Sequence, residues 1–373
     1  MGKNIVVCLD GTGNEFEENN SNVVKLFRVI ERDTSQVAYY DPGVGTLADP
    51  AYKTPVVKKI NKLLGLAFGR GITQNVVEAY SFIMDHFEQG DRLFLFGFSR
   101  GAYTTRVLAG LIHSCGLLEP GCQNLIPYAM KLYKAEKVDF KTMSRFKSSF
   151  GRNVKIDFLG LWDSVSTIGW IYNPVFLPYT TNNKSVHIVR HALAIDEKRS
   201  FFKEMRWGKS YKDKQNIKEV WFPGVHSDVG GGYSEKESGL AKISLEWMIK
   251  EAVGPNAGDR ENPQQFGLKI KQGKFDRYVF GKGTSEYVGP DSASNMHESL
   301  IGHWKLVQWI PRSVWLVDEG REAVRKPPSH RMIEVGETLH NSVLERIQKC
   351  DYHPPSLNGR SIEEIKKDFN FEP

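Results

Sequence analysis

Five short apolar runs recur along the chain, and each ends in a loop that is rich in glycine or acidic residues. They span residues 4–9 (NIVVCL), 37–40 (VAYY), 92–96 (RLFLF), 154–161 (VKIDFLGL) and 219–225 (EVWFPGV). Near-continuous apolar runs of this length are typical of strands buried on both faces, as the strands of parallel sheets are. The pattern therefore predicts a mostly parallel sheet.

Helical patterns lie between these runs. Residues 75–87 carry apolar side chains at helical spacing, and residues 102–111 follow the third run without a helix breaker. Alternating strands and helices are typical of an α/β fold with helices on both faces of the sheet. Because residues 255–295 are rich in Gly, Pro, Asn, Asp and Lys, we place the core at 1–255 and an irregular insertion and C-terminal extension, packed on that core, at 256–373.

The composition excludes several classes of protein. With 40% hydrophobic and 25% charged residues, the 373-residue chain is neither disordered nor fibrous. A net charge of +6 from 50 basic and 44 acidic residues is too balanced for a nucleic-acid scaffold. Four cysteines without a CxxC spacing argue against a disulfide framework and a zinc site, so we expect free thiols, no metal and no cofactor.

The sequence contains neither an apolar run of the roughly 18 residues that span a bilayer nor a secretory signal, which predicts a cytoplasmic protein. Residues 51–70 combine Lys58, Lys59 and Lys62 with neighbouring apolar side chains. This stretch is either a helix packed on the body, or a lid or interfacial helix that contacts a membrane surface.

Residues 97–101 (GFSRG) form a GxSxG pentapeptide at the joint between a predicted strand and a predicted helix. A strained strand-to-helix turn needs glycine on both sides and exposes the serine hydroxyl. The same turn places backbone N–H groups at a helix N-terminus, where they stabilise a developing oxyanion. We predict Ser99 as a nucleophile and the N–H of Arg100 as an oxyanion donor. The alternative is a structural turn in which Ser99 only caps the helix.

A serine nucleophile needs a base, and a histidine base is usually oriented by a carboxylate. In hydrolases with this strand–turn–helix joint, the acid and then the histidine follow the serine along the chain, each beyond a later strand. Asp163 follows the fourth apolar run, and His226 follows the fifth and precedes a run of glycines. We predict Asp163 as the acid and His226 as the base. The competing acids are Asp196, in a segment expected to be helical, and Asp228, close to His226.

Asp10, Gly11 and Thr12 follow the first apolar run, at the side of the sheet where ligands of open α/β folds bind. The N–H of Gly11 or Thr12 is a candidate second oxyanion donor, and the alternative is a plain turn in which Asp10 bonds its own loop. A third interpretation makes Asp10 a phosphoryl acceptor or metal ligand, with Asp163 and Asp228 as further carboxylates.

Seven blocks of sequence occur in a fixed order within residues 3–255. They are KNIVVCLDGTGN, YYDPGVGT, GRGITQNVVEAYSFIMDHF, DRLFLFGFSRGAYTTRVLAGLI, FLGLWDSVSTIG, RHALAIDEKRSFF and VWFPGVHSDVGGGY. Together they resemble the uncharacterised α/β-hydrolase family that contains the first class of type VI secretion phospholipase effectors. The resemblance implies a phospholipase that cuts acyl ester bonds with a serine triad, with the nucleophile at Ser99, the base at His226 and the acid at Asp163.

Residues 296–312 resemble a further block of that family, which makes His297 a second histidine to consider near the site. Secreted members are often longer and carry an additional membrane-docking region. The resemblance therefore leaves open whether the chain is an effector delivered by a secretion system or a housekeeping esterase.

The sequence thus predicts an α/β-hydrolase-like protein that hydrolyses an acyl ester of a lipid, with no nucleic-acid partner. Two other functions stay open. One is a metal-dependent phosphohydrolase that uses Asp10, and the other is a non-catalytic interaction protein on a hydrolase scaffold.

Overall fold

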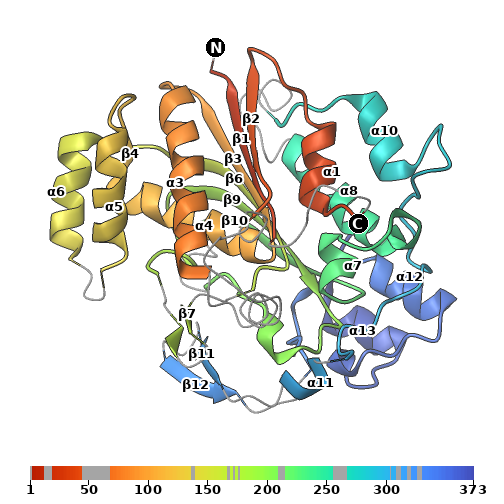
Figure 1. Cartoon of the computed structure of the whole chain (residues 1–373). Helices are drawn as coiled ribbons and strands as arrows, with labels where there is room; N and C mark the ends of the chain where they lie inside the picture. Colours follow the sequence, from red (N-terminus) through yellow and green to blue (C-terminus); the bar gives the residue numbers. More distant parts are fainter. Residues whose placement is uncertain are drawn as a thin grey trace, which may run out of the picture.

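Helices lie on both sides of one twisted sheet in the computed structural model of the protein (Figure 1). The structure describes residues 2–11, 19–43, 68–135, 139–165, 169–170, 173–174, 177–208, 215–254, 267–302, 304–307, 312–316, 321–325 and 330–373.

The sheet has eight strands in the order β14-β13-β10-β9-β6-β3-β1-β2, and every neighbouring pair in it is parallel. Its strands are β1 (Asn4–Leu9), β2 (Gln36–Asp41), β3 (Arg92–Phe98), β6 (Ile156–Trp162), β9 (Val186–Ala194), β10 (Asn216–Phe222), β13 (Thr338–His340) and β14 (Asn370–Glu372). Parallel strands end on one side of a sheet, which we call the carboxyl rim and which here includes Leu9, Phe98 and Trp162.

The strand side chains alternate between two hydrophobic cores. In β1, Ile5, Val7 and Leu9 belong to the core beside α3 (Phe68–His86) and α4 (Arg100–Cys115). Val6 and Cys8 belong to the core beside α1 (Asn22–Val29) and α8 (Gly239–Val253). The two-residue period of a strand sends neighbours to opposite faces, so both faces need a cover of helices.

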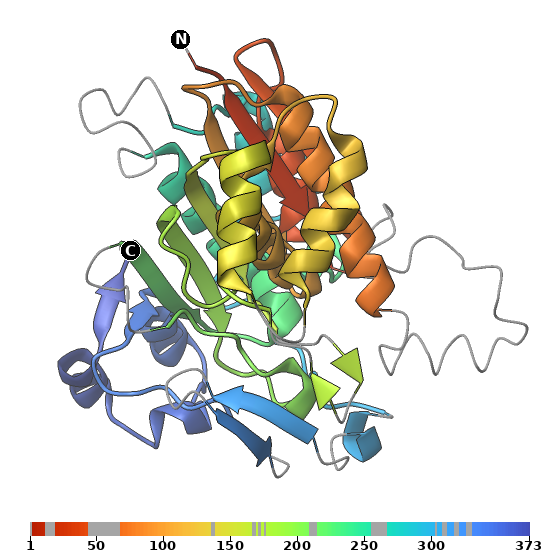
Figure 2. The same ribbon diagram turned by 90° about the vertical axis from the view of Figure 1, so that its left-hand side faces the viewer.

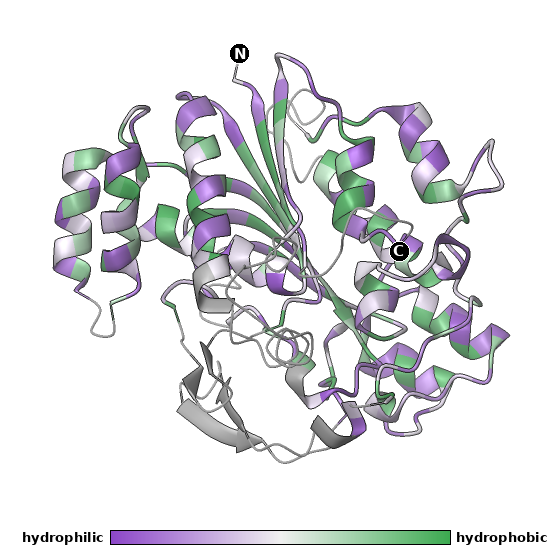
Figure 3. Cartoon of the chain, in the orientation of Figure 1, coloured by the Kyte–Doolittle hydropathy of each residue, from purple (hydrophilic) through white to green (hydrophobic). Residues whose placement is uncertain are grey.

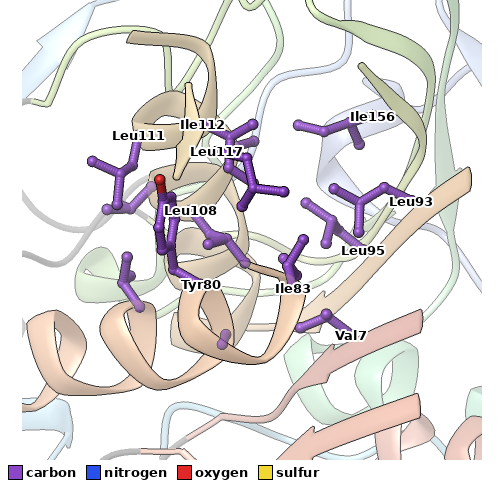
Figure 4. Close-up of a cluster of buried hydrophobic side chains, with 14 of the residues drawn as sticks. Val7, Tyr80, Ile83, Leu93, Leu95, Leu108, Leu111, Ile112, Leu117 and Ile156 are labelled. Atoms are coloured by element: carbon purple, nitrogen blue, oxygen red, sulfur yellow. The ribbon is translucent and has the colours of Figure 1, made fainter. Parts of the chain in front are cut away.

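Figure 4 shows part of the first core. Leu93 and Leu95 of β3 lie in one cluster with Ile83 of α3 and Leu108 of α4, and all four side chains are fully buried. Burying a side chain of this size stabilises a fold by about 1.5–3 kcal/mol. This cluster therefore fixes α4, and with it the serine turn at its start, against the sheet.

An outer layer covers α4. It consists of α5 (Ile126–Tyr133) and α6 (Phe140–Phe150), which lie at the left in Figure 1 and face the viewer in Figure 2. Apolar residues are concentrated along the strands, whereas the helices mix apolar and polar residues (Figure 3). This distribution is expected where helices bury one face and expose the other.

Shorter strands and further helices lie around this sheet. Three two-stranded antiparallel pairs join β4 (Leu117–Leu118) to β5 (Gly151–Arg152), β7 (Gly169–Trp170) to β8 (Asn173–Pro174), and β11 (Arg312–Leu316) to β12 (Arg321–Arg325). The further helices are α7 (His226–Gly230), α10 (Gln272–Phe280), α11 (Trp304–Val307), α12 (Ser342–Lys349) and α13 (Ile362–Asp368).

The five predicted strands are confirmed as β1, β2, β3, β6 and β10, and the two predicted helices as α3 and α4. The helix expected around residues 190–199 is wrong, because residues up to 194 form the central strand β9. Two polar side chains of β9 are buried: Arg190 pairs with Glu251, and His191 pairs with Glu219. These partners lie far away in the sequence, so the local pattern does not reveal a buried strand.

The predicted extension at 256–373 is not irregular throughout. Strands β13 and β14 extend the main sheet beyond β10. A third core packs Leu339, Val343 and Ile365 together with Trp221 of β10. The boundary at residue 255 stays a prediction, but residues on both sides of it build one sheet.

The lid or membrane-contact prediction for residues 51–70 falls almost entirely outside the described residues, and only its last three residues are seen, at the start of α3. Among the helices that the structure describes, none is both long and apolar enough to cross a membrane.

Candidate active site

Ser99 and Asp163 directly follow the neighbouring strands β3 and β6 at the carboxyl rim. The ladder of backbone hydrogen bonds continues past both strands: the Ser99 N–H donates to the Trp162 carbonyl at 3.0 Å, and the Asp163 N–H donates to the Ala192 carbonyl at 2.8 Å. Both residues have a positive φ, 57° at Ser99 and 38° at Asp163. Such strained conformations cost about 1–3 kcal/mol each and cluster at functional sites.

Close packing requires the glycines on either side of Ser99. A Cβ atom on Gly97 would lie 2.4 Å from Oγ1 of Thr105, and one on Gly101 would lie 2.2 Å from the carbonyl oxygen of Leu9. The turn is therefore pressed between helix α4 and strand β1. The Ser99 side chain makes no capping hydrogen bond to α4, so the alternative in which Ser99 only caps the helix is wrong.

Asp163 is the acid that contacts His226. Nδ1 of His226 lies 2.5 Å from Oδ2 of Asp163, and the two side chains are 4% and 0% exposed. Oδ1 of Asp163 also accepts a hydrogen bond from the Ala194 N–H at 3.0 Å. Because Nδ1–H of the imidazole donates to a carboxylate, Nε2 carries the lone pair that can accept a proton.

Two aromatic rings hold the imidazole of His226. The Phe98 ring lies 4.7 Å away between centroids, and the Phe202 ring meets the imidazole edge to face at 4.8 Å. The His226 backbone N–H donates to Glu197 at 3.2 Å. Phe98 is the last residue of β3 and precedes Ser99, so this contact brings the imidazole to the strand end that carries the serine.

Arg331 is a further residue of the site, and the sequence did not predict it. Its guanidinium binds both oxygens of Asp163, with Nη1 2.5 Å from Oδ1 and Nη2 2.9 Å from Oδ2. Two-point contacts between a guanidinium and a carboxylate are among the strong hydrogen bonds of proteins. No local motif marks Arg331, which lies 168 positions from Asp163 in the chain.

Burial and ion pairing set the charges of these groups. Burial acts to raise the pKa of Asp163, but the Arg331 guanidinium and the hydrogen bond from His226 outweigh burial and hold that pKa well below its usual range. Burial lowers the pKa of His226, although the Asp163 carboxylate opposes this shift. At neutral pH the site therefore contains an ionised Asp163 beside a neutral imidazole, which is the state that a general base requires.

The predicted oxyanion donors have different outcomes. Arg100 begins helix α4 directly after Ser99, so its N–H lies at a helix N-terminus, and its role as a donor stays a prediction. Gly11 also lies against the serine, since a Cβ on Gly11 would be 3.3 Å from Cβ of Ser99. However, the Gly11 N–H donates to Oδ1 of Asp10 at 2.7 Å, so the prediction that it is a free second donor is wrong. Thr12 lies outside the described residues.

Asp10 holds the loop that follows β1. Its carboxylate is buried and accepts hydrogen bonds from the Gly11 N–H at 2.7 Å, the Ser21 hydroxyl at 2.5 Å and the Tyr40 hydroxyl at 3.1 Å. The interpretation that Asp10 bonds its own loop is therefore confirmed. Among the described residues, no three His, Cys, Asp or Glu side chains gather as a metal ion would require, so the convergence of carboxylates that the phosphohydrolase alternative needs is not found there.

The competing acids have other partners. Asp196 accepts hydrogen bonds from the Gly224 N–H at 2.7 Å and the Tyr352 hydroxyl at 2.8 Å. Asp228 accepts from Nδ1 of His297 at 2.7 Å, which forms a second Asp–His pair at helix α7. Of the three candidate acids, Asp163 is the one for which the described structure shows a contact with His226, and its role as the acid stays a prediction. His297 joins the segment before α11 to α7.

Comparison with known proteins finds similar proteins among curated sequences and among solved structures. An uncharacterized protein of Saccharomyces cerevisiae is 36% identical over 222 residues, which are 55% of this chain and 32% of the yeast protein. The chain therefore spans about a third of the length of that relative.

Two of the similar solved structures have low sequence identity to this chain. A crystal structure of an uncharacterized protein from Pseudomonas aeruginosa has 18% identity and a TM-score of 0.44, over 78% of this chain and 49% of that one. The structure of the Tle1 effector bound to the VgrG spike from the type 6 secretion system has 21% identity and a TM-score of 0.38, over 64% and 52%. Residues 3–251 match the family model described as type VI secretion phospholipase effector Tle1-like, catalytic domain. The chain thus belongs to the Tle1-like phospholipase effector family through this catalytic domain.

Proposed function

We propose that this protein hydrolyses acyl ester bonds of phospholipids, with Ser99 as the nucleophile, His226 as the base and Asp163 as the acid. The observation that supports this proposal most directly is the buried Asp163–His226 pair beside the end of β3, where a strained serine follows. The family match supports a lipase or phospholipase function.

In the first half of the reaction, Nε2 of His226 takes the proton of the Ser99 hydroxyl while Oγ attacks the acyl carbon. The carbonyl electrons move onto oxygen, and the Arg100 N–H at the start of α4 stabilises this oxyanion together with an N–H of the loop after β1, for which Thr12 is the remaining candidate. Each such donor lowers the barrier by about 3–4 kcal/mol. Asp163 stabilises the imidazolium that forms.

In the second half, the oxyanion collapses and expels the alcohol, which takes its proton from His226. A water molecule, deprotonated by the same imidazole, then attacks the acyl-enzyme. The fatty acid leaves and Ser99 regains its proton. The cycle consumes one water and needs no further reactant.

The decisive experiment compares wild type with Ser99→Ala. We expect the substitution to lower kcat by a factor on the order of 10⁶ and to abolish labelling by a fluorophosphonate probe. Ser148→Ala, the same change at an exposed serine of α6, is the matched control and should keep full activity. Turnover by Ser99→Ala would end the serine mechanism, and an unlabelled, inactive wild type would favour a non-catalytic scaffold.

The physical state of the substrate tests the lipid assignment. We expect faster hydrolysis of phospholipid vesicles than of a soluble short-chain ester at equal ester concentration. A preference for the soluble ester would assign the protein to the esterases instead.

Family membership also supports delivery through a type VI secretion system, and comparison of culture supernatants with and without an intact system tests this.

A further inference from the structure

The guanidinium of Arg331 binds Asp163, the predicted acid of the candidate triad. It binds both oxygens of Asp163, at 2.5 Å and 2.9 Å. Oδ2, which accepts the longer of these contacts, is also the oxygen that faces Nδ1 of His226. One buried carboxylate is therefore shared between an arginine and the candidate base.

Arg331 also fixes the surroundings of the base. Nη2 donates to the carbonyl of Phe202 at 2.5 Å, and the Phe202 ring packs edge to face on the imidazole of His226. Nη1 donates to the Ala194 carbonyl at 2.7 Å, and the N–H of Ala194 binds Asp163. A single side chain thus holds the acid, the end of strand β9 and the ring that borders the base.

Arg331 is only 2% exposed and lies beyond the stretch 3–251 that matches the family model. We propose that Arg331 is a positioning residue for ester hydrolysis, which orients the Asp163 carboxylate toward His226 and neutralises part of its charge. This inference rests on the proposed function, because it gives Arg331 a part in the reaction of Ser99.

The charges around the Asp163–His226 pair determine in which direction the pH profile of kcat/KM moves when Arg331 is replaced. Besides Arg331 and Asp163, the ionisable groups among the described residues that act on His226, Asp163 or the guanidinium include Glu197, Arg199, Glu204 and His191. Arg331 neutralises part of the Asp163 charge and so weakens the stabilisation of a protonated His226. Without Arg331, both Asp163 and His226 should bind protons more readily. Both changes move the acid limb of the kcat/KM profile to higher pH.

The test is the pH profile of kcat/KM for a p-nitrophenyl ester with wild type, Arg331→Met and Arg331→Lys. We expect the midpoint of the acid limb, at which kcat/KM has fallen to half, to lie about 1–3 pH units higher in Arg331→Met than in wild type. We also expect a lower kcat/KM on the plateau at higher pH. Arg331→Lys keeps the charge but cannot bind both oxygens, so its limb should move in the same direction by less. The rate of fluorophosphonate labelling at each pH should follow the same order.

Arg346→Met is the matched control, because Arg346 is also buried in the C-terminal part and donates to the carbonyls of Ser292 and Ser294 at 2.6 Å and 2.7 Å. Its acid limb should coincide with that of wild type. An unmoved limb in Arg331→Met would show that Arg331 only stabilises the fold.

Failure to fold does not remove the test. If circular dichroism shows that Arg331→Met does not fold, the profile of Arg331→Lys decides: a raised limb supports the inference and an unmoved one overturns it. Ser99→Ala, assayed in parallel, separates the two proposals. Activity in Ser99→Ala rejects the serine mechanism. If Ser99→Ala is inactive and the acid limb of the Arg331 variants coincides with that of wild type, only the role of Arg331 is rejected.

Discussion

Oδ2 of Asp163 lies 2.5 Å from Nδ1 of His226, although 63 positions separate the two residues in the chain. The contact forms because β6 and β10 run parallel and end on the same side of the sheet. Both groups are buried, so the interaction is screened little by solvent. Their pairing is the basis for the predictions that follow.

Replacing Asp163 with a neutral side chain of the same size tests whether its charge is needed for activity. Asp163→Asn keeps the size of the side chain but removes its charge, and we expect kcat to fall by a factor on the order of 10⁴ because the imidazole loses its correct tautomer. The substitution also removes the carboxylate that binds the buried Arg331 guanidinium at two points and leaves Glu204, at 3.3 Å, as its remaining ion-pair partner among the described residues. This loss should lower the free energy of unfolding by about 3–5 kcal/mol. Steady-state kinetics and urea unfolding measure the two effects.

Asp157→Asn is the control for this substitution. Asp157 is the second residue of the same strand, at the end opposite to the carboxyl rim, and accepts a hydrogen bond from the Leu93 N–H at 2.9 Å. Its kcat should stay near that of wild type. An Asp163→Asn variant as active as Asp157→Asn would exclude Asp163 from the reaction.

The pH dependence of activity follows from the lowered pKa of His226. A base must be neutral, and burial lowers the pKa of His226 below its ordinary value of about 6.5. We therefore expect kcat/KM to stay constant on acidification from pH 8 and to fall only below about pH 6.5. A midpoint above that value would contradict a buried, neutral imidazole.

Stability should decline in acid for the same reason. The native pKa values of both Asp163 and His226 are lowered, so the unfolded state binds more protons once the pH falls below the unfolded pKa of each group. The His226 contribution is lost below about pH 6.5 and that of Asp163 below about pH 4. Urea unfolding at pH 7, 5.5 and 4 should show a stepwise decrease, and an increase towards acid would reverse the assigned shifts.

The serine turn should not tolerate a side chain at Gly101. An added Cβ would lie 2.2 Å from the Leu9 carbonyl oxygen, and backbone atoms there cannot move away as a flexible side chain could. We expect Gly101→Ala to lower the free energy of unfolding by at least about 1–3 kcal/mol and to lower kcat, because the turn carries Ser99.

Gly273→Ala provides the comparison. Gly273 lies in helix α10, and an added Cβ meets no atom within 4 Å. Alanine has the higher helix propensity, so this variant should be neutral or more stable by up to about 1 kcal/mol. Equal unfolding free energies for the two alanine variants would contradict the packing described at the serine turn.

Asp10 should act through the loop and not through a metal ion. Asp10→Asn weakens the hydrogen bonds from Gly11, Ser21 and Tyr40, so we expect lower stability and a moderate loss of kcat, with hydrolysis by wild type unaffected by a chelator. Tyr40→Phe removes one of these bonds and should show a smaller effect. Loss of activity with a chelator, and its survival in Ser99→Ala, would restore the phosphohydrolase alternative.

The sequence predicts the centre of the fold better than its periphery. Strands such as β1 and β3 are long apolar runs whose pattern is fixed by burial on both faces, and the glycines around Ser99 are required by backbone packing. Strand β9 was missed because the polar side chains of Arg190 and His191 are neutralised by partners from distant elements. Strands β13 and β14 have only three residues each, too few for a period to appear.

In the candidate site, too, the sequence indicates some features and not others. Ser99, Asp163 and His226 stand out in the sequence because each follows an apolar run that ends at the carboxyl rim, and their roles stay predictions. The engagement of the Gly11 N–H by Asp10 depends on side-chain rotation, so the sequence could only offer it as one of several alternatives. Arg331 could not be found because an arginine in an irregular segment carries no period and no motif, and only the folded chain brings it to Asp163.

The position of Arg331 has a consequence for exchanging parts between relatives. The acid and its counter-ion lie on opposite sides of the point where the match to the family ends, at residue 251. A recombination event or an engineered graft that joins one parent up to that point with another parent beyond it would inherit the carboxylate from one and the guanidinium from the other. Viable hybrids should therefore be those in which both parents supply the same two charges.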